Sequence, residues 1–371
     1  MDKFSIRVGY ALIGLSLDVW RDVCIHVSNG FIESIERGGS CSSDSIGGLS
    51  FIALPQPGNA HVHSADHSFP EYGINLDLRD LVAPPHGIKH KLLESTPIAE
   101  LISGIREFYM LSWLSGLGLI IDFREGGGLG CKLAVNARSN LPPGLEVTIL
   151  GRPGPEWPEG CEGLGVSSPL DYDIGLLRDL SNKFKPSMAH VAETTEDRLR
   201  GDLERALEAK LDAIVHGTHL SREDLVVLKE RNIGLIMCPR SNLWHNTGTP
   251  PIAEALRIGV LLALGTDNAS WIPPDIWGEA QQALLLARSQ GLKEEWAAKK
   301  IIESILINPY LITRKEPPVI EEGKKAKMII YNIEGTGIPK AREIYHAIVK
   351  RINLSKIAIR IDNSKISTIK A

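Results

Sequence analysis

The stretch SMAHVAETTEDRLRGDLERALEAKLDAIVHG, residues 187–217, predicts a strand, a helix and a second strand in succession. Short apolar runs stand at its two ends. Between them, residues 194–210 place acidic side chains early, apolar side chains at helical spacing and a lysine at the end, as an amphipathic helix does. The stretch therefore has the pattern of one βαβ unit of a parallel sheet.

The same alternation extends in both directions along the chain and predicts up to eight strands. They are NAHVH (59–63), LGLIIDF (117–123), VTILG (147–151), GLGV (163–166), SMAHVA (187–192), DAIVHG (212–217), GLIMCP (234–239) and VLLALGTD (260–267). The third and fourth rest on short apolar runs among glycines and prolines. Eight such units in roughly 250 residues match an α/β fold of the (β/α)8 TIM barrel type, whose active site lies at the C-terminal ends of the strands.

Both ends of the chain predict β-structure outside the barrel. CIHVSNGFIESIERG (24–38) gives two alternating segments around Asn29-Gly30, which is a strong hairpin signal. The tail holds AKMIIYNI, REIYHAIVKRI and SKIAIRID, which are β-branched and alternating. We expect residues 1–54 and 313–371 to form one small composite β-sandwich beside a barrel domain of residues 55–312.

Composition excludes several classes of protein. The chain has 371 residues, of which 43% are hydrophobic, and its net charge of −4 argues against a nucleic-acid binder. No stretch approaches the roughly 20 apolar residues of a membrane helix, and MDKFSIRVGY lacks the layout of a secretion signal, so we expect a cytoplasmic protein that binds no membrane. The five cysteines are scattered without a CxxC pair, so we expect neither a disulfide framework nor a thiolate zinc site.

Four candidate metal ligands stand at the ends of predicted strands. His61 and His63 end the first strand, where residues two apart point to the same side and can chelate one ion. His190 ends the fifth strand and Asp267 ends the eighth. Each has an ordinary structural interpretation, a packing histidine or a helix N-cap. Four such residues at matching strand ends favour a metal site.

Other polar residues near the predicted strand ends have open roles. His216 follows the sixth apolar run directly and is a better candidate for the interior than His219, which belongs to the loop or to the next helix. Arg240 and His245 follow the seventh strand and are candidates for substrate recognition. The loop from Ser64 to Ser95 is long enough to act as a lid or is simply solvated. Its candidate substrate contacts are His67, His86, Lys89 and His90.

Three tryptophans, Trp244, Trp271 and Trp277, fall near the last two strand ends. They either stack on a planar substrate ring or anchor the core.

Five ordered motifs, HVH after a PGN turn, HVAE, VHGTHL, CPRSN and LGTDN, resemble the deaminase and chlorohydrolase branch of the amidohydrolase superfamily, which includes enzymes similar to cytosine, guanine and S-adenosylhomocysteine deaminases. The resemblance implies that His61, His63, His190 and Asp267 bind a single divalent metal, zinc or alternatively iron. It implies that Glu193 shuttles protons and that His216 polarises the substrate or positions the water. It also implies that Asp267 accepts the proton of the attacking water.

Two features qualify the resemblance. CEGLGVSSP, around the fourth strand, has no lysine where binuclear relatives carry a carboxylated one, which favours one metal. The second strand ends in DFREGG rather than in the usual Thr-rich turn, so substrate contacts are expected to differ.

The leading functional hypothesis is hydrolytic deamination of a small aminated heterocycle, either a free base, a nucleoside or a related metabolite. A second hypothesis keeps the fold and the metal but hydrolyses a ring amide, an amidine or a C–Cl bond. A third is a non-catalytic paralogue that serves as a scaffold, although such proteins typically lose metal ligands. A homodimer is expected by analogy alone.

Overall fold

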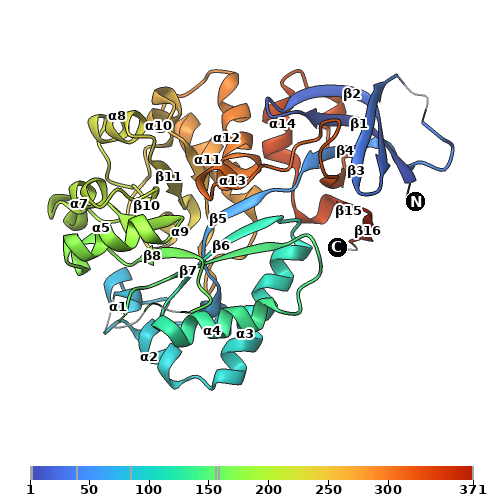
Figure 1. Cartoon of the computed structure of the whole chain (residues 1–371). Helices are drawn as coiled ribbons and strands as arrows, with labels where there is room; N and C mark the ends of the chain where they lie inside the picture. Colours follow the sequence, from blue (N-terminus) through green and yellow to red (C-terminus); the bar gives the residue numbers. More distant parts are fainter. Residues whose placement is uncertain (1–2, 39–40, 84–85, 155–156, 158, 370–371) are drawn as a thin grey trace.

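The computed structural model describes residues 3–38, 41–83, 86–154, 157 and 159–369 of the chain. All eight predicted barrel strands are present. Figure 1 shows how the elements of the chain are arranged. The first seven strands are β5 (Gly58–His63), β6 (Leu119–Arg124), β7 (Glu146–Gly151), β8 (Gly163–Val166), β9 (Ser187–Val191), β10 (Ala213–His216) and β11 (Gly234–Met237). The eighth is divided into β12 (Leu262–Leu264) and β13 (Asp267–Asn268). The weakly predicted β8 has the predicted bounds.

These strands form one parallel sheet in the order β12-β11-β10-β9-β8-β7-β6-β5-β13. β12 and β13 are consecutive pieces of the eighth predicted strand. Because β12 pairs with β11 and β13 pairs with β5, the sheet closes on itself as a TIM-like barrel. An inner core lies within it, and the ring of its member Phe123 packs against His61 with 4.3 Å between ring centroids.

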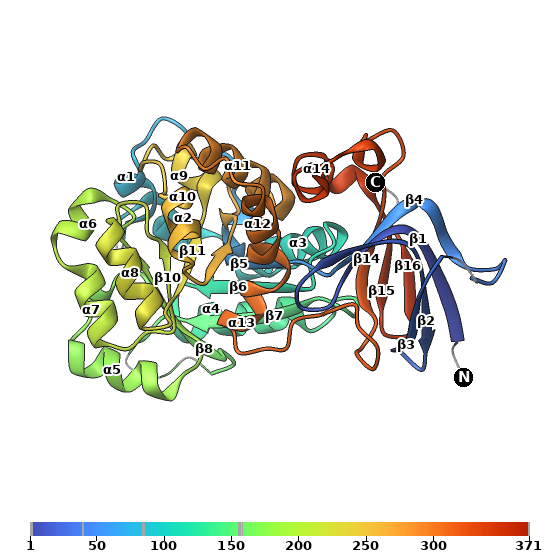
Figure 2. The ribbon, with the colours of Figure 1, turned by 90° about the horizontal axis from the view of Figure 1, so that it is seen from above.

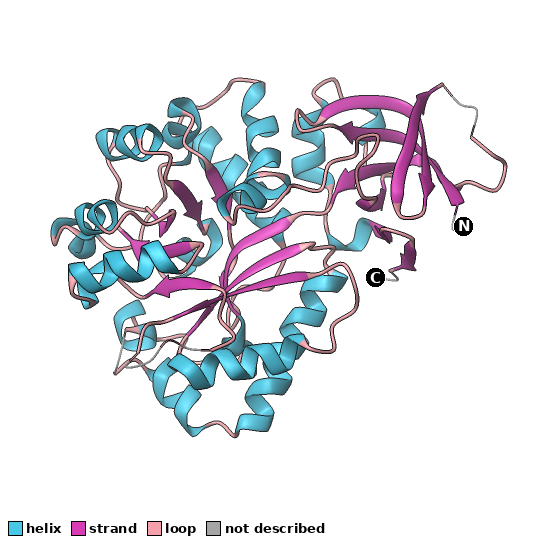
Figure 3. Cartoon of the chain, in the orientation of Figure 1, coloured by secondary structure: helices cyan, strands magenta, loops and turns pink. Residues whose placement is uncertain are grey.

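Helices surround the parallel strands, as the cyan elements of Figure 3 show. They are α3 (Ile98–Leu114), α4 (Gly127–Arg138), α5 (Ile174–Lys183), α6 (Thr195–Leu199), α7 (Asp202–Glu208), α8 (Arg222–Glu230), α9 (Pro239–Trp244), α10 (Ile252–Ile258), α11 (Ile276–Ser289), α12 (Trp296–Leu306) and α13 (Asn308–Ile312), with the 3-10 turn η2 (Pro169–Asp171). The helix predicted over 194–210 is interrupted at Gly201, whose φ of +83° leaves the helical region.

The long segment after β5 is partly helical. It contains η1 (Ser64–Ser68), α1 (Leu78–Val82) and α2 (Ile88–Ser95). The alternative of a simply solvated loop is wrong for part of it, because Lys89 on α2 is buried.

The two ends of the chain share a second sheet, in the order β16-β15-β14-β4-β1-β2-β3. Its strands are β1 (Lys3–Ile13), β2 (Asp18–Ser28), β3 (Phe31–Arg37), β4 (Ile46–Pro55), β14 (Lys327–Asn332), β15 (Ile357–Asp362) and β16 (Lys365–Thr368). The predicted pairing of the two ends is confirmed, since β4 and β14 are antiparallel neighbours, and Figure 2 shows this sheet beside the barrel. The predicted hairpin turn has Asn29 and Gly30 at φ +52° and +81°.

The hydrogen bonding of this second sheet is continuous across all seven strands. A division into the two packed layers of a sandwich is therefore not confirmed, and the domain limits at 54/55 and 312/313 stay predictions. Apolar side chains from both chain ends, among them Val8, Val27, Met328 and Ile361, pack together in its core.

The second of the three strands predicted in the tail is wrong. REIYHAIVKRI forms α14 (Ile344–Arg351), between the short turns η3 (Ile338–Lys340) and η4 (Leu354–Lys356). Its apolar residues Ile344, Ala347 and Ile348 have the i, i+3, i+4 spacing of a helix face. The segment therefore fits the period of a helix as well as the alternation of a strand. α14 packs against α11 and α12.

The expectation of unpaired cysteines is also wrong. Cys24 pairs with Cys41 and Cys131 pairs with Cys161, while Cys238 is a buried free thiol. The Cα atoms are 5.5 Å apart in the first pair and 5.6 Å apart in the second, which is the range of a disulfide. Because the partners of each pair are far apart in sequence, their spacing along the chain does not indicate the pairing. Within the described ranges, no helix combines the length and the apolar character needed to span a membrane.

Candidate metal centre and active site

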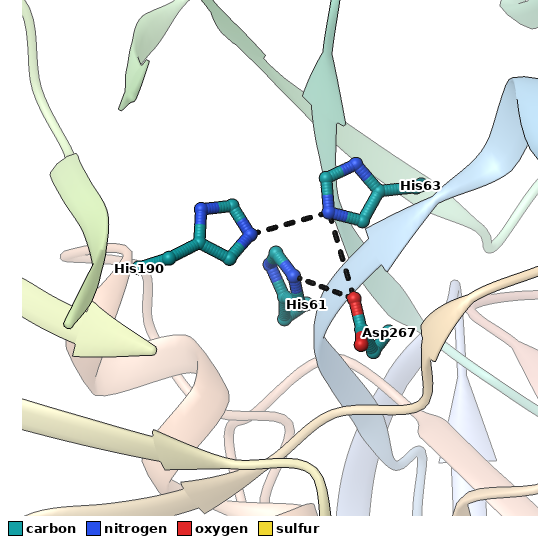
Figure 4. A group of neighbouring side chains, drawn as sticks. All are labelled: His61, His63, His190 and Asp267. Carbon is teal, nitrogen blue, oxygen red and sulfur yellow. Dashed lines mark hydrogen bonds and ion pairs between the residues drawn. The ribbon is translucent and has the colours of Figure 1, made fainter. Parts of the chain in front are cut away.

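The four predicted metal ligands converge at the ends of barrel strands (Figure 4). β13 pairs with β5 so that Asp267 lies opposite Val62, between His61 and His63. Oδ1 of Asp267 is 3.1 Å from Nε2 of His61 and 3.5 Å from Nε2 of His63. Nε2 of His63 is 3.3 Å from Nε2 of His190 on β9. Three imidazole nitrogens and one carboxylate oxygen therefore face one point.

The outer nitrogens of two of these rings are already engaged. Nδ1 of His190 donates to the carbonyl oxygen of Val166 at 3.0 Å, and Nδ1 of His63 lies 2.7 Å from Oε1 of Glu125. With their protons on Nδ1, both rings turn an Nε2 lone pair towards the other. Two lone pairs this close repel unless a cation lies between them. The donor set thus fits a divalent metal such as zinc, and such outer contacts are typical of metal-bound histidine.

The electrostatics of these groups agree with that fit. Burial lowers the pKa of His63 to about 3 and the pKa of His190 well below its ordinary value, so both rings are neutral, which is the ligand form. Burial alone would raise the pKa of Asp267. The hydrogen bond from His61 instead holds the pKa of Asp267 well below its usual range.

The second carboxylate oxygen of Asp267 is hydrogen-bonded to the segment after β11. Oγ of Ser241, on α9, donates to Oδ2 of Asp267 at 2.5 Å. Asp267 and His216 have φ values of +65° and +72°, in a backbone region that residues other than glycine rarely adopt. Strained backbone of this kind at strand ends is typical of functional sites.

A second group of side chains joins the first at Asp267. One ligand-type atom from each of Glu193, His216 and Asp267 lies within 4.8 Å of the others. Nε2 of His216 is 3.6 Å from Oε1 of Glu193, and Nδ1 of His216 accepts a hydrogen bond from the Asn242 amide at 3.1 Å. Nε2 of His216 therefore carries the proton and faces Glu193. Burial, together with Asp267, raises the pKa of Glu193 well above its ordinary value.

A cavity of about 420 Å³ opens onto these groups. His63, His190, Glu193, His216 and Asp267 line it, and so do the cationic side chains Arg79, Lys89, Arg152 and Arg200. Among the described residues of its lining, none is Phe, Tyr or Trp. The cavity is therefore suited to a polar substrate.

None of the three tryptophans lines the cavity. Trp271 is buried and donates to the carbonyl oxygen of Tyr72, while Trp277 is fully buried and donates to the hydroxyl of Tyr331. Trp244 is 49% exposed. The core interpretation holds for the first two.

The remaining candidates divide between the cavity and the scaffold. His245 lines the cavity and packs edge-on against Trp271. His219 instead connects loops, with Nε2 donating to the Thr247 carbonyl. Arg240 is tied to buried Glu279 at 2.6 Å and lies outside the lining.

Of the loop histidines, His67 lies 3.9 Å from Glu107 and His90 donates to the carbonyl oxygen of Val82. His86 is exposed.

Sequence reasoning missed Glu125 and Asp66. Both are buried, and both contact Lys89. The signal for Glu125 was present, since DFREGG departs from the family pattern at a strand end.

The fold and the site define a metal-dependent hydrolase built on a closed parallel barrel. Residues 184–353 match the amidohydrolase family. The chain is 31% identical over 361 residues to a 5-methylthioadenosine/S-adenosylhomocysteine deaminase of Moorella thermoacetica, covering 85% of this chain and 81% of that protein. It is 32% identical over 301 residues to an uncharacterised protein of Methanocaldococcus jannaschii, covering 74% and 77%. The chain belongs to the amidohydrolase family, and it is a hydrolase that acts on carbon–nitrogen bonds other than peptide bonds.

Solved structures share the fold. A zinc-bound adenosine deaminase of Xanthomonas campestris matches with a TM-score of 0.83 at 15% identity, over 99% of this chain and 93% of that one. The zinc complex of atrazine chlorohydrolase of Arthrobacter aurescens matches with a TM-score of 0.80 at 15% identity, over 99% and 96%. These two neighbours carry different chemistry on one architecture, so the fold alone does not select the reaction.

Proposed function

We propose that the protein is a hydrolytic deaminase of a small aminated heterocycle, a free base, a nucleoside or a related metabolite. We further propose that His61, His63, His190 and Asp267 hold one divalent ion, zinc or alternatively iron. The observation that carries the proposal is Glu193, which lies beside His216 and near Asp267 in the cavity and whose raised pKa favours a proton on its carboxyl group. The deaminase of Moorella thermoacetica, 31% identical, supports the same reaction.

A divalent metal bound at such a site supplies a water molecule whose pKa falls from about 15.7 towards 7. Asp267 would accept a proton from the water that attacks the carbon bearing the amino group. Nε2–H of His216 donates a hydrogen bond to the oxygen of this water. Glu193 would give its proton to the neighbouring ring nitrogen and then pass to the departing amine the proton that Asp267 had taken up. Glu193 would regain a proton from the attached hydroxyl group as the carbonyl forms. One water and one amino compound give one carbonyl compound and one ammonia.

The cationic and acidic lining favours a polar substrate, since a charged wall is costly to cover with an apolar group. The retained donor set argues against a scaffold paralogue. The homodimer and the cytoplasmic location stay predictions, which light scattering and cell fractionation test.

Ammonia release tests the proposal. Metal-loaded protein is incubated with aminopurines, aminopyrimidines, their nucleosides, and aminated pterins and triazines. Metal-stripped protein serves as the control. We expect ammonia from at least one compound, and only with metal. Metal-loaded protein that is silent across the panel contradicts deamination and favours hydrolysis of a ring amide, an amidine or a C–Cl bond, which assays of ring opening and chloride release detect.

A further inference from the structure

Lys89 on α2 is a buried cation at the wall of the cavity, and its side chain is only 4% exposed. Its Nζ lies 2.7 Å from Oδ2 of Asp66 and 2.7 Å from Oε1 of Glu125. A buried ammonium is tolerated only when carboxylates neutralise it. Two carboxylates from different parts of the chain, η1 and the end of β6, therefore meet at this one side chain.

One of these carboxylates contacts a candidate metal ligand, and the other contacts the residue next to a second candidate ligand. Oε1 of Glu125, the atom that contacts Lys89, also lies 2.7 Å from Nδ1 of His63. Oδ2 of Asp66 accepts a 2.6 Å hydrogen bond from the side-chain amide of Asn268, the residue directly after Asp267. The ammonium thus lies between a carboxylate that contacts His63 on β5 and a carboxylate that contacts Asn268, the neighbour of Asp267 on β13.

Arg124 fixes the other side of Glu125. Its Nη2 donates to Oε2 of Glu125 at 2.8 Å, and its Nε is 3.4 Å from Oδ1 of Asp122. Arg152 stands farther away, 4.0 Å from Oε1 of Glu125. With Oε2 held by Arg124, Oε1 is shared by Lys89 and His63, so the position of Lys89 bears directly on the orientation of the His63 ring.

We propose that Lys89 is a positioning residue of the metal centre, which orients His63 through Glu125 and orients β13, with Asp267 and Asn268, through Asp66. This rests on the proposed metal site. Because coupling between two equilibria is reciprocal, metal binding and the packing of residues 64–83 and 86–95 stabilise each other. The segment after β5 is in this view part of the metal centre, and Lys89 acts on the metal rather than on the substrate.

The dissociation constant of zinc, measured by competition with a chromogenic chelator and without substrate, tests the proposal. We expect Lys89→Met and Glu125→Gln each to weaken binding about 10- to 100-fold, as loss of an outer-shell contact typically does. The double variant should be little weaker than either single one, because both changes interrupt one chain of contacts. Lys89→Arg should recover part of the affinity. The matched control is Lys91→Met, an exposed lysine of the same helix, which should bind like wild type.

Two further measurements separate positioning from general loss of structure. Cobalt-substituted Glu125→Gln should show shifted visible absorption bands, since a turned His63 ring alters the ligand field. Zinc should slow amide exchange across residues 86–95 in wild type and less so in Lys89→Met. Glu125→Gln leaves Lys89 paired with Asp66, so it keeps the test available if Lys89→Met fails to fold.

The contrary outcomes are distinct. Zinc affinity within twofold of wild type in folded Lys89→Met and Glu125→Gln, with a raised KM in Lys89→Met, would make Lys89 a substrate-binding group and overturn the proposal. Additive losses in the double variant would overturn the shared chain of contacts. Wild-type protein that binds no zinc would instead overturn the proposed metal site itself.

Discussion

Ser241→Ala removes one hydrogen bond from the candidate metal centre and leaves the rest in place. The Ser241 hydroxyl donates to Oδ2 of Asp267 at 2.5 Å, while Oδ1 of the same carboxylate faces His61 and His63. Ser241 is 1% exposed and Asp267 is 6% exposed, so water does not replace the lost donor readily. The carboxylate then loses the contact that fixes the plane in which Oδ1 points at the metal position.

The size of the effect follows from the kind of bond. A hydrogen bond to a charged group contributes about 1.5–3 kcal/mol. If that free energy is lost from the metal-bound form, the metal dissociation constant rises by about 10- to 150-fold, since about 1.4 kcal/mol corresponds to a factor of ten. Chelator competition at fixed pH and ionic strength measures this constant directly.

Ser304→Ala is the matched control. Ser304 is also fully buried, and its hydroxyl donates to the Ile301 carbonyl at 2.6 Å on α12, outside the site. We expect Ser304→Ala to lower the thermal midpoint and to leave metal affinity unchanged. An unchanged dissociation constant in folded Ser241→Ala would refute the role of the hydroxyl in orienting Asp267.

Three further predictions concern the proton shuttle, the buried imidazoles and the cysteines. Glu193→Gln should abolish turnover and keep the metal, because the side chain acts as an acid and not as a ligand; metal loss in this variant would make Glu193 a ligand. Burial lowers the pKa of four imidazoles from 6.5, so below that pH the unfolded chain binds more protons than the folded one. Metal-free protein should therefore lose stability as pH falls from 6.5 towards 3, by up to about 1.4 kcal/mol per pH unit for each histidine, with Glu193 opposing. Urea unfolding at two pH values checks this, and equal stability at both would contradict it. Thiol titration of denatured, unreduced protein should find one free thiol, Cys238; five would contradict the disulfides.

The barrel and the convergence of the four candidate ligands could be predicted because both depend on local pattern. Apolar runs bounded by turn residues locate parallel strands, and even GLGV, four residues long, was found in this way. Parallel strands bring their C-terminal ends to one edge, so the sequence predicts that His61, His63, His190 and Asp267 lie close together.

What could not be predicted depends on residues far apart in sequence or on ambiguous periods. Lys89, Asp66 and Glu125 come from two segments whose packing no local pattern encodes. The cysteine pairs are likewise made by tertiary structure. REIYHAIVKRI alternates like a strand, yet Ile344, Ala347 and Ile348 also form a helical face, and packing against α11 and α12 favours the helix.

Titration of zinc into metal-free protein, with ammonia release followed on the substrate found by the panel, tests the central claim most directly. If one ion binds at His61, His63, His190 and Asp267, activity is absent without metal and rises linearly with added zinc. It stops rising at one equivalent of zinc per chain. Ammonia release without metal, or a break at two equivalents, would contradict a single catalytic ion at this site.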